Sequence, residues 1–315
     1  MTRTELNILL MRSDDALRQE VERIAPGSRT FTRDDLDADE GLLDRVDVLY
    51  GWGVHNLLAR AKRARWCQTV SAGVGWIQQP EIVRHPAVVT NVHIYDECIA
   101  EHLFGLLLVL IRRLDAAVRN QAAHEWKRVG EVDVLKGRTA VVVGCGSIGS
   151  RCAELAAAFG MNVLGVRRTA GPVPHVEAVF GVDRLLDALA RADVVFDLLP
   201  GTNETRHLLG ARELAALPHG ALLLNAGRGT TVDTDALVEA LKSGQLGGAG
   251  LDVTDPEPLP PDHPLWDAPN VVITPHYSGA AAGNSRQADE VFLENLRRFV
   301  ADEPLINVAD KERGY

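Results

Sequence analysis

The chain has 315 residues, of which 46% are hydrophobic and 24% charged, a composition typical of globular proteins and long enough to predict two domains. A formal net charge of -10 argues against a nucleic-acid partner, because phosphate backbones are bound by clustered lysines and arginines. No apolar run reaches the length of a membrane span and the first residues lack the pattern of a signal peptide, so we expect a cytoplasmic protein without a membrane partner.

The first hundred residues carry the signals of a small α/β domain. Short apolar runs, each about as long as a buried strand, lie at 6–11, 46–51, 67–73 and 87–91. The stretch "NLLARAKRAR" at 56–65 is expected to form a helix between two of them. We therefore predict a smaller, flavodoxin-like domain with a doubly wound parallel sheet.

From about residue 138 onward, apolar runs alternate with helical stretches, which is typical of a parallel sheet. The runs show no polar alternation, so both faces of each strand are expected to lie under crossover helices. They read "TAVVVG", "NVLGV", "DVVFDLL", "ALLLNAG", "GGAGLD" and "NVVITPH". This order predicts a second doubly wound α/β domain, of the Rossmann type.

Two helices are expected to connect the domains. One is a buried helix near 98–113, and the other is an amphipathic helix near 285–300. The chain is thus predicted to leave the first domain once and to return to it at the end. The predicted domains are residues 1–97 with 284–315, and residues 98–283.

The four cysteines, Cys67, Cys98, Cys145 and Cys152, form no C-x-x-C pair and have no histidine at metal-ligand spacing. We expect buried, reduced thiols and no metal ion. With the acidic net charge, this favours a small-molecule partner.

The stretch "VVVGCGSIGS" at 141–150 carries a G-x-G-x-x-G pattern formed by Gly144, Gly146 and Gly149. A strand precedes it, a helix follows, and "NVLGV" supplies the second strand of the unit. In such a unit the first glycine permits a tight turn, the second lets the backbone approach a pyrophosphate, and the third lets the helix pack on the sheet. The helix N-terminus attracts the anion. This context predicts a dinucleotide site, with a glycine turn that only packs as the alternative.

The residues after "NVLGV" bear on which dinucleotide is bound. An acidic side chain at this place would bond the adenosine ribose of NAD and repel a 2′-phosphate. The chain instead has Arg167, Arg168 and Thr169, and guanidinium groups make geometrically matched bonds to phosphate oxygens. We predict that NADP(H) is preferred and NAD(H) is a second cofactor; two solvated surface arginines are the alternative.

Three later segments, 223–237, 248–266 and 271–280, place polar residues directly after apolar runs, where strands of the sheet should end. Ligands bind at this carboxyl edge in doubly wound sheets. Hydride transfer to a 2-keto acid needs an imidazole to protonate the carbonyl oxygen, a carboxylate to fix that imidazole, and a planar cation for the substrate carboxylate. We assign these roles to His276, Glu257 and Arg228. Taken singly, each has an alternative as an ordinary loop or surface residue.

These segments resemble the D-isomer-specific 2-hydroxyacid dehydrogenases, which include glyoxylate/hydroxypyruvate reductases and phosphoglycerate dehydrogenases. The resemblance covers about 70–315 and is carried by "NAGRGTTVDTDAL", "GAGLDVTDPEPLP", "HPLW", "NVVITPH" and the glycine turn. It implies that Arg228 binds the keto-acid carboxylate and carbonyl, that Glu257 pairs with His276, and that His276 donates the proton. Many members have aspartate where Arg167 stands, and this departure puts NAD use in question.

The resemblance also implies roles for further residues. Asp252 is expected to bind the nicotinamide carboxamide, and Thr205 to line the adenosine side. Ser147 and Ile148 are expected to meet the pyrophosphate. In the discontinuous first domain, which would bind the substrate, the loop "SAGVGW" supplies the backbone amides of Gly73 and Val74 for the substrate carboxylate.

The resemblance also bears on the segment at 120–128 and on Trp52. The segment "NQAAHEWKR" at 120–128 resembles the family's dimer arm, which implies a homodimer. Before residue 70 the match is loose, and Trp52 is considered as a lid of the substrate pocket. The identity of the keto acid therefore stays open.

We expect an NADP-preferring dehydrogenase that reduces small 2-keto acids, such as glyoxylate or hydroxypyruvate, to D-2-hydroxy acids. The alternative is a catalytically silent, NAD(P)-binding regulatory protein of the corepressor type, because relatives of these enzymes serve as corepressors and a fold does not settle a function. A serine hydrolase is not favoured, since no G-x-S-x-G elbow is present.

Overall fold

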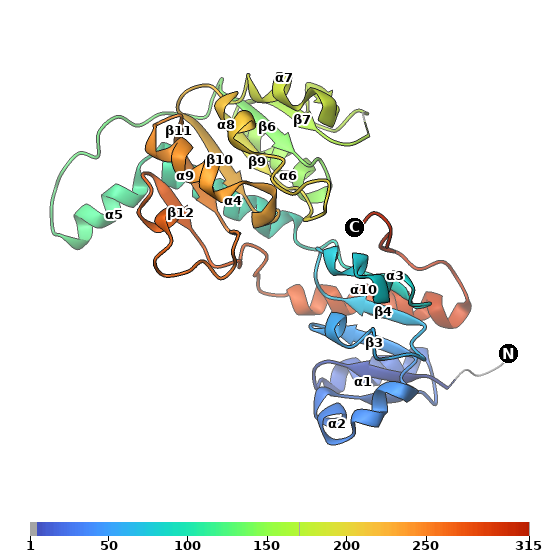
Figure 1. Cartoon of the computed structure of the whole chain (residues 1–315). Helices are drawn as coiled ribbons and strands as arrows, with labels where there is room; N and C mark the ends of the chain where they lie inside the picture. Colours follow the sequence, from blue (N-terminus) through green and yellow to red (C-terminus); the bar gives the residue numbers. More distant parts are fainter. Residues whose placement is uncertain (1–4, 170, 315) are drawn as a thin grey trace. The chain divides into compact units, whose positions relative to one another are not determined.

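The computed structural model describes residues 5–169 and 171–314, and the chain divides into two compact units (Figure 1). Unit 1 consists of Met1–Ile94 and Ala281–Tyr315, and unit 2 consists of Tyr95–Ala280. The chain thus leaves unit 1 at 94 rather than at the predicted 97, and returns at 281 rather than at 284. The expected connecting helices, α4 (Asp96–Ile111) and α10 (Asn284–Ala301), begin shortly after these crossings.

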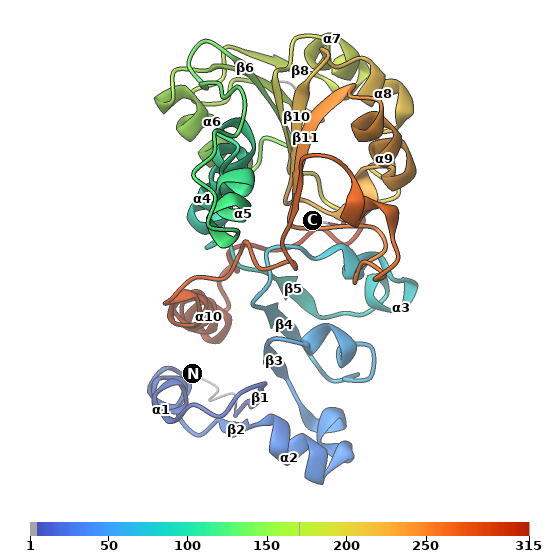
Figure 2. The ribbon, with the colours of Figure 1, turned by 90° about the vertical axis from the view of Figure 1, so that its left-hand side faces the viewer.

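Unit 1 contains a five-stranded parallel sheet in the order β2-β1-β3-β4-β5, the doubly wound order of flavodoxin-like domains. Its strands are β1 (Asn7–Leu10), β2 (Arg29–Phe31), β3 (Val48–Gly51), β4 (Trp66–Thr69) and β5 (Val88–Thr90). Helices α1 (Asp15–Ile24) and α10 cover one face, and α2 (Arg33–Ala38) and α3 (Pro80–Val83) lie on the other (Figure 2). The predicted class of this domain is confirmed.

The core of unit 1 joins its two chain segments. On α10, Ala288, Phe292 and Leu296 recur every four residues, so they lie on one face of the helix, and all three are buried. Phe292 stacks on Tyr50 of β3, with ring centroids 4.0 Å apart, and packs against Trp66 of β4. The C-terminal helix is therefore part of this hydrophobic core.

Unit 2 contains a seven-stranded parallel sheet in the order β12-β11-β10-β9-β6-β7-β8, a Rossmann order extended by one strand. The strands are β6 (Thr139–Val143), β7 (Asn162–Val166), β8 (Ala178–Phe180), β9 (Val194–Asp197), β10 (Ala221–Asn225), β11 (Leu246–Leu251) and β12 (Val271–Ile273). The helices besides α4 are α5 (Leu114–Ala122), α6 (Ser147–Ala158), α7 (Leu185–Leu189), α8 (Ala211–Ala215) and α9 (Thr234–Lys242). This confirms the predicted Rossmann-type domain.

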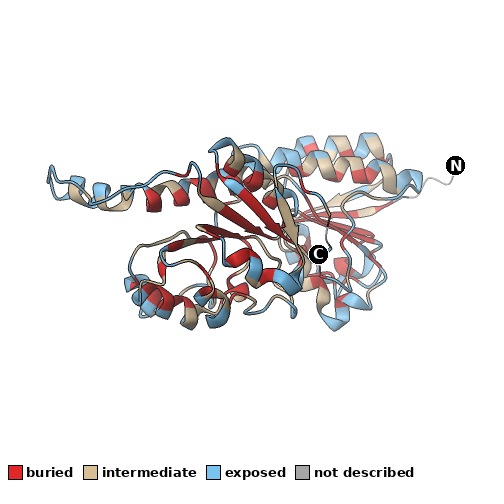
Figure 3. Cartoon of the chain, turned by 90° about the horizontal axis from the view of Figure 1, so that it is seen from above, coloured by how far each residue is buried: buried red, intermediate tan, exposed pale blue. Residues whose placement is uncertain are grey.

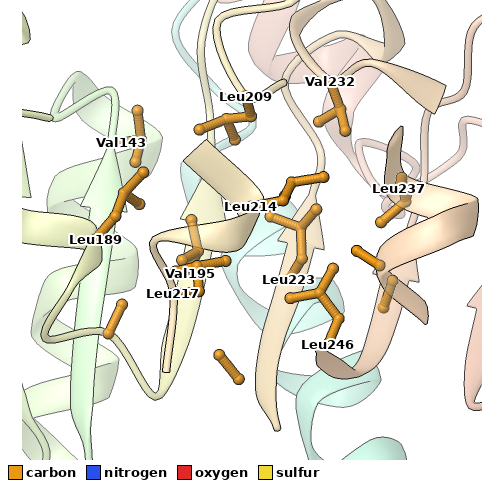
Figure 4. Close-up of a cluster of buried hydrophobic side chains, with 14 of the residues drawn as sticks. Val143, Leu189, Val195, Leu209, Leu214, Leu217, Leu223, Val232, Leu237 and Leu246 are labelled. Atoms are coloured by element: carbon orange, nitrogen blue, oxygen red, sulfur yellow. The ribbon is translucent and has the colours of Figure 1, made fainter. Parts of the chain in front are cut away.

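Helices cover both faces of the sheet of unit 2, as Figure 2 shows. Helices α4 and α6 pack on one face, while α7, α8 and α9 pack on the other. Figure 4 shows side chains of the hydrophobic cluster between the sheet and helices α7, α8 and α9. In it, Val195 and Leu223 of the sheet face Leu214 of α8 and Leu237 of α9. Burial on both faces explains why these strands read as continuous apolar runs (Figure 3).

Three details differ from the prediction. The helix expected at 56–65 is wrong, because the chain forms a short 3-10 helix, Val54–Asn56, followed by turns. Leu58, Ala61 and Ala64 are nevertheless buried. Most backbone hydrogen bonds of this segment join an amide to the carbonyl oxygen three residues earlier, as in a 3-10 helix, and not four residues earlier, as in an α-helix. The strands β2 and β8 were missed; each is a three-residue edge strand without a fully buried residue, so each lacks an apolar run.

Helix α5 and the segment after it form the most exposed part of unit 2. No residue of α5 is buried, and the ribbon reaches away from the remainder of the unit (Figures 1 and 3). Val118 is 64% exposed and the Trp126 side chain is fully exposed. Over the described residues, no helix combines the length and apolar character required to cross a bilayer.

Candidate active site

The glycine turn between β6 and α6 is built by close backbone contacts. Gly144 has φ +101°, and a Cβ on it would lie 2.8 Å from the carbonyl oxygen of Leu198. A Cβ on Gly149 would lie 2.2 Å from the carbonyl oxygen of Gly144. Larger residues would therefore force the turn apart, as the sequence pattern predicts for the first and third glycines.

The second glycine leaves room for a ligand. Gly146 is exposed, and a Cβ on it would meet no atom within 4 Å. It is the N-cap of α6, so the amides of Ser147, Ile148 and Gly149 in the first turn have no partner within the helix. Ser147 is exposed and Ile148 is partly buried. An open approach to backbone amides at a helix N-terminus fits a pyrophosphate.

The two arginines lie beside this turn. Val143 and Val166 end adjacent parallel strands in register, and the amide of Gly144 donates to the carbonyl oxygen of Val166 at 2.9 Å. Arg167, Arg168 and Thr169 follow directly. Arg168 forms an exposed ion pair with Glu204, with 3.4 Å between Nη1 and Oε2. The guanidinium groups of Arg167 and Arg168 thus place positive charge next to the glycine turn.

His276 and Glu257 are brought together from different strand-following loops. Nδ1 of His276 lies 2.5 Å from Oε1 of Glu257, and both side chains are exposed. His276 follows β12 and has φ +51°, a left-handed conformation that is unusual outside glycine. Its amide donates to the carbonyl oxygen of Asp252 at 2.9 Å, which holds the loop at the end of β11.

Arg228 lies on the segment between β10 and α9. Its Nη1 donates to the carbonyl oxygen of Gly227 at 2.6 Å. Burial lowers the pKa of Arg228, and the negative charge of Glu257 acts in the opposite direction. An arginine remains protonated in proteins, so this partly buried side chain is a cation under the electrostatic influence of Glu257.

Asp252 is buried directly after β11 and has partners inside the protein. One carboxylate oxygen accepts from the Thr274 hydroxyl at 2.6 Å and the Tyr277 amide at 3.1 Å, and the other accepts from the Ser278 amide at 3.0 Å. Burial raises the pKa of Asp252, but these hydrogen bonds outweigh burial and the pKa is lowered overall. This geometry holds the loop of His276; contact with the nicotinamide carboxamide stays a prediction.

His102 extends this network. Its Nε2 lies 2.9 Å from the Thr274 hydroxyl oxygen. Its ring makes an edge-to-face contact with the ring of Tyr277, with 5.1 Å between the ring centroids. Neither His102 nor Thr274 is predicted as a site residue from the sequence. Each is an ordinary polar residue beside an apolar run, and their contact joins residues 172 positions apart, which no local pattern reveals.

Asp197 is a second buried carboxyl group that sequence analysis missed. It ends β9 and is fully buried, and burial raises its pKa to about 7 although hydrogen bonds from Thr231 and Leu199 oppose this. Oδ2 lies 2.5 Å from the Thr231 hydroxyl oxygen. The signal available was the aspartate at the end of the apolar run "DVVFD".

The Thr205 hydroxyl forms hydrogen bonds within the loop at 200–205. It donates to the carbonyl oxygen of Pro200 at 2.5 Å and accepts from the Thr202 amide at 2.9 Å. A role toward the adenosine stays a prediction.

The loop of Gly73 and Val74 belongs to unit 1. Val74 is buried and Gly73 is partly buried. Their amides donate to no acceptor within the described part of the chain, so they are available for a carboxylate. Trp52 follows β3 between two glycines with positive φ, Gly51 and Gly53, and its side chain is 70% exposed.

Comparisons with known proteins show the family of the chain. The model of the family described as "D-isomer specific 2-hydroxyacid dehydrogenase, NAD binding domain" matches residues 104–278. Glyoxylate reductase of Aeropyrum pernix is 35% identical over 283 residues, covering 86% of this chain and 82% of that protein.

Solved structures agree over almost the whole chain. A D-isomer-specific 2-hydroxyacid dehydrogenase of Xanthobacter autotrophicus, in complex with NADPH and MES, has a TM-score of 0.85 and 30% identity, covering 99% of this chain and 100% of that one. An NADPH-dependent glyoxylate/hydroxypyruvate reductase of Sinorhizobium meliloti, in complex with NADP and sulfate, has a TM-score of 0.84 and 27% identity, with coverages of 99% and 100%.

Proposed function

The chain belongs to the D-isomer-specific 2-hydroxyacid dehydrogenase family, and on this premise we propose that it reduces small 2-keto acids to D-2-hydroxy acids with NADPH. Glyoxylate, hydroxypyruvate and related acids are the proposed substrates. Several similar proteins are named glyoxylate reductase, which supports this substrate class.

The pairing of His276 with Glu257 carries the proposal. Reduction of a carbonyl group requires a proton at its oxygen, and an imidazole is suited to supply one near neutral pH. With Nδ1 bonded to Glu257 at 2.5 Å, Nε2 of His276 is the nitrogen that donates to the substrate. The carboxylate of Glu257 fixes the ring and stabilises its protonated form.

Arg228 is proposed to bind the carboxylate of the keto acid. A guanidinium makes two parallel bonds to a carboxylate, which orients the substrate as well as binding it. For unit 1, the amides of Gly73 and Val74 are proposed as binding groups for a substrate carboxylate, since backbone N–H groups without a protein partner are suited to an anion.

The cofactor is proposed to bind across the glycine turn. When bound, it supplies the hydride that reduces the carbonyl carbon. The amides of Ser147 and Ile148 face the pyrophosphate, and Arg167, Arg168 and Thr169 bind the 2′-phosphate of NADPH. Two solved neighbours in complex with NADPH or NADP support this preference.

Initial rates of NADPH and NADH oxidation with glyoxylate, hydroxypyruvate and phenylpyruvate test the proposal. We expect oxidation that is faster with NADPH and a product of D configuration on chiral analysis. If both cofactors bind and neither is oxidised with any keto acid, the activity is excluded, and the corepressor-type regulatory function becomes the alternative.

A further inference from the structure

The hydroxyl group of Thr231 lies between two oxygen atoms. It is 2.5 Å from Oδ2 of Asp197 and 2.6 Å from the carbonyl oxygen of Arg228. A hydroxyl carries a single proton and can donate to one of these oxygens at a time. The other contact also has hydrogen-bond length, so a second proton must lie between its two oxygen atoms. A backbone carbonyl group has no proton to supply. The carboxyl group is the one member of the three that can supply it.

We propose that Asp197 carries a proton and donates it to Thr231, so that Thr231 donates to the carbonyl oxygen of Arg228 and the aspartic acid acts as a positioning residue for that arginine. The chain of donors therefore runs from the end of β9 to the backbone of the proposed carboxylate-binding residue. The inference rests on the proposed function for its effect on catalysis.

The surroundings of Asp197 favour the protonated form. The side chain is fully buried, and within residues 5–169 and 171–314 its Oδ1 accepts one hydrogen bond, from the amide of Leu199 at 3.2 Å. Burial raises the pKa of this carboxyl to about 7, against the hydrogen bonds from Thr231 and Leu199. Among the residues that the structure describes, no ion pair to Asp197 is formed. Asp197 pairs in register with Val143 of β6 and Asn225 of β10. Titratable residues that follow these two strands include Cys145, Arg228 and Asp233, and the helices on this face of the sheet carry Asp187 on α7, Arg212 and Glu213 on α8, and Asp235, Glu239 and Lys242 on α9.

The carbonyl oxygen of Arg228 is a point where its backbone is fixed. It accepts from the Thr231 hydroxyl, from Nδ2 of Asn225 at 3.2 Å and from the Thr231 amide at 3.2 Å. The hydroxyl contact is the shortest of the three. Arg228 itself has extended φ and ψ of −139° and 143° directly before the 3-10 helix Gly229–Thr231. Loss of the hydroxyl bond therefore loosens the residue that is proposed to hold the substrate.

Ionisation of Asp197 reverses the donor chain. A carboxylate is a stronger acceptor than a carbonyl, so Thr231 then donates to Asp197 and no longer to Arg228. The two protonation states thus differ in how firmly Arg228 is held. The effect should appear in the KM for the keto acid, because the donor chain ends on the backbone of Arg228, the residue proposed to bind the substrate carboxylate.

Steady-state rates as a function of pH test this chain in wild type and three variants. Asp197→Asn keeps a permanent N–H donor, Thr231→Ser keeps the hydroxyl, and Thr231→Val removes it with little change in shape. In wild type and Thr231→Ser, the KM for glyoxylate should rise roughly 10-fold as the pH increases through neutrality. Asp197→Asn should keep a low KM without this rise, and Thr231→Val should have a high KM at every pH.

The NADPH dissociation constant and the circular dichroism spectrum of each variant serve as controls for folding and should not change. A wild-type rise of KM that persists in Asp197→Asn, or an unchanged KM in Thr231→Val, overturns the proposal.

A measurement without turnover separates this inference from the proposed function. Infrared spectra of the protein alone should contain the carbonyl-stretching band of a protonated carboxyl group at pH 6, and Asp197→Asn should lack it. A wild-type spectrum that equals that of Asp197→Asn contradicts the proton on Asp197, whatever the enzyme reduces. If the band is present and no keto acid is reduced, the proposed function fails while the donor chain stands.

Discussion

His276 Nδ1 and Glu257 Oε1 lie 2.5 Å apart, although the two residues follow different strands of the sheet. This contact engages Nδ1 of His276 with the Glu257 carboxylate, and it fixes the plane of the imidazole ring. The positive φ of His276, +51°, turns the chain at this residue, and its amide bond to the Asp252 carbonyl oxygen holds the turned backbone.

Replacing His276 with Asn should lower kcat for glyoxylate reduction by about 10²- to 10⁴-fold, because the proton donor is removed while a small polar side chain is kept. NADPH binding, followed by fluorescence, should be unchanged. His219→Asn is the matched control, since His219 is exposed and precedes β10 at the opposite edge of the sheet. Near wild-type kcat in His276→Asn would remove this histidine from the mechanism.

Replacing Arg228 with Lys should raise the KM for the keto acid by about 10- to 100-fold, since a point charge replaces a planar, two-pronged donor. Steady-state kinetics at saturating NADPH measure this. Arg212→Lys, an exposed arginine on α8, should leave KM at its wild-type value. The same KM in both variants would contradict binding of the substrate carboxylate by Arg228.

Replacing Glu204 with Gln should strengthen NADPH binding about 2- to 5-fold and leave NADH binding unchanged, because the exposed ion pair with Arg168 competes with the 2′-phosphate. Isothermal titration calorimetry with each cofactor tests this. The control Asp187→Asn breaks an ion pair of similar exposure with Arg184. An equal gain for NADH would show that the effect does not involve the 2′-phosphate.

The pH dependence of stability should differ between wild type and Asp197→Asn. The pKa of Asp197 is raised to about 7 in the folded protein, whereas an unfolded aspartate has a pKa near 3.9. Between these values the folded state binds more protons, so wild-type stability falls as pH rises from about 4 to about 7, and the loss levels off above that.

The total loss is about 4 kcal/mol relative to the variant, which cannot ionise at this position. Urea denaturation of both proteins at several pH values measures the difference. A difference that stays constant with pH would mean that Asp197 titrates alike in the folded and unfolded chain.

Homodimer formation through the α5 segment remains a prediction from the family resemblance. Val118→Asp and Trp126→Asp place charge on strongly exposed apolar side chains and should shift a dimer toward monomer. Size-exclusion chromatography with light scattering measures the mass. Val182→Asp, which alters another exposed apolar residue of unit 2, should leave it unchanged. A wild-type monomer would refute the expected homodimer.

The sequence was sufficient to predict the two sheets where strands are buried on both faces. In β6, the four consecutive buried residues Ala140, Val141, Val142 and Val143 form an unbroken apolar run. The edge strands β2 and β8 carry partly buried residues, so their sequences resemble loops. The expected helix at 56–65 failed because its apolar residues were buried by turns, which local propensity does not describe.

The predicted catalytic residues share one property, which is their place on the segments that follow strands of the sheet. Since parallel strands end at one edge, the sequence was enough to expect that Glu257 and His276 would meet. It was not enough to identify the buried partners. Whether Asp197 reaches Thr231, or His102 reaches Thr274, depends on side-chain packing between segments far apart in the chain.

The return of the chain to unit 1 has a consequence for biosynthesis. Phe292 and Leu296 of α10 complete the core around Tyr50 and Trp66, yet α10 is translated after the whole of unit 2. During synthesis, the apolar face that α10 covers therefore stays open while unit 2 emerges and can fold. A ribosome-bound chain that stops before α10 should accordingly bind chaperones through its first ninety residues, and release them once the final helix has left the exit tunnel.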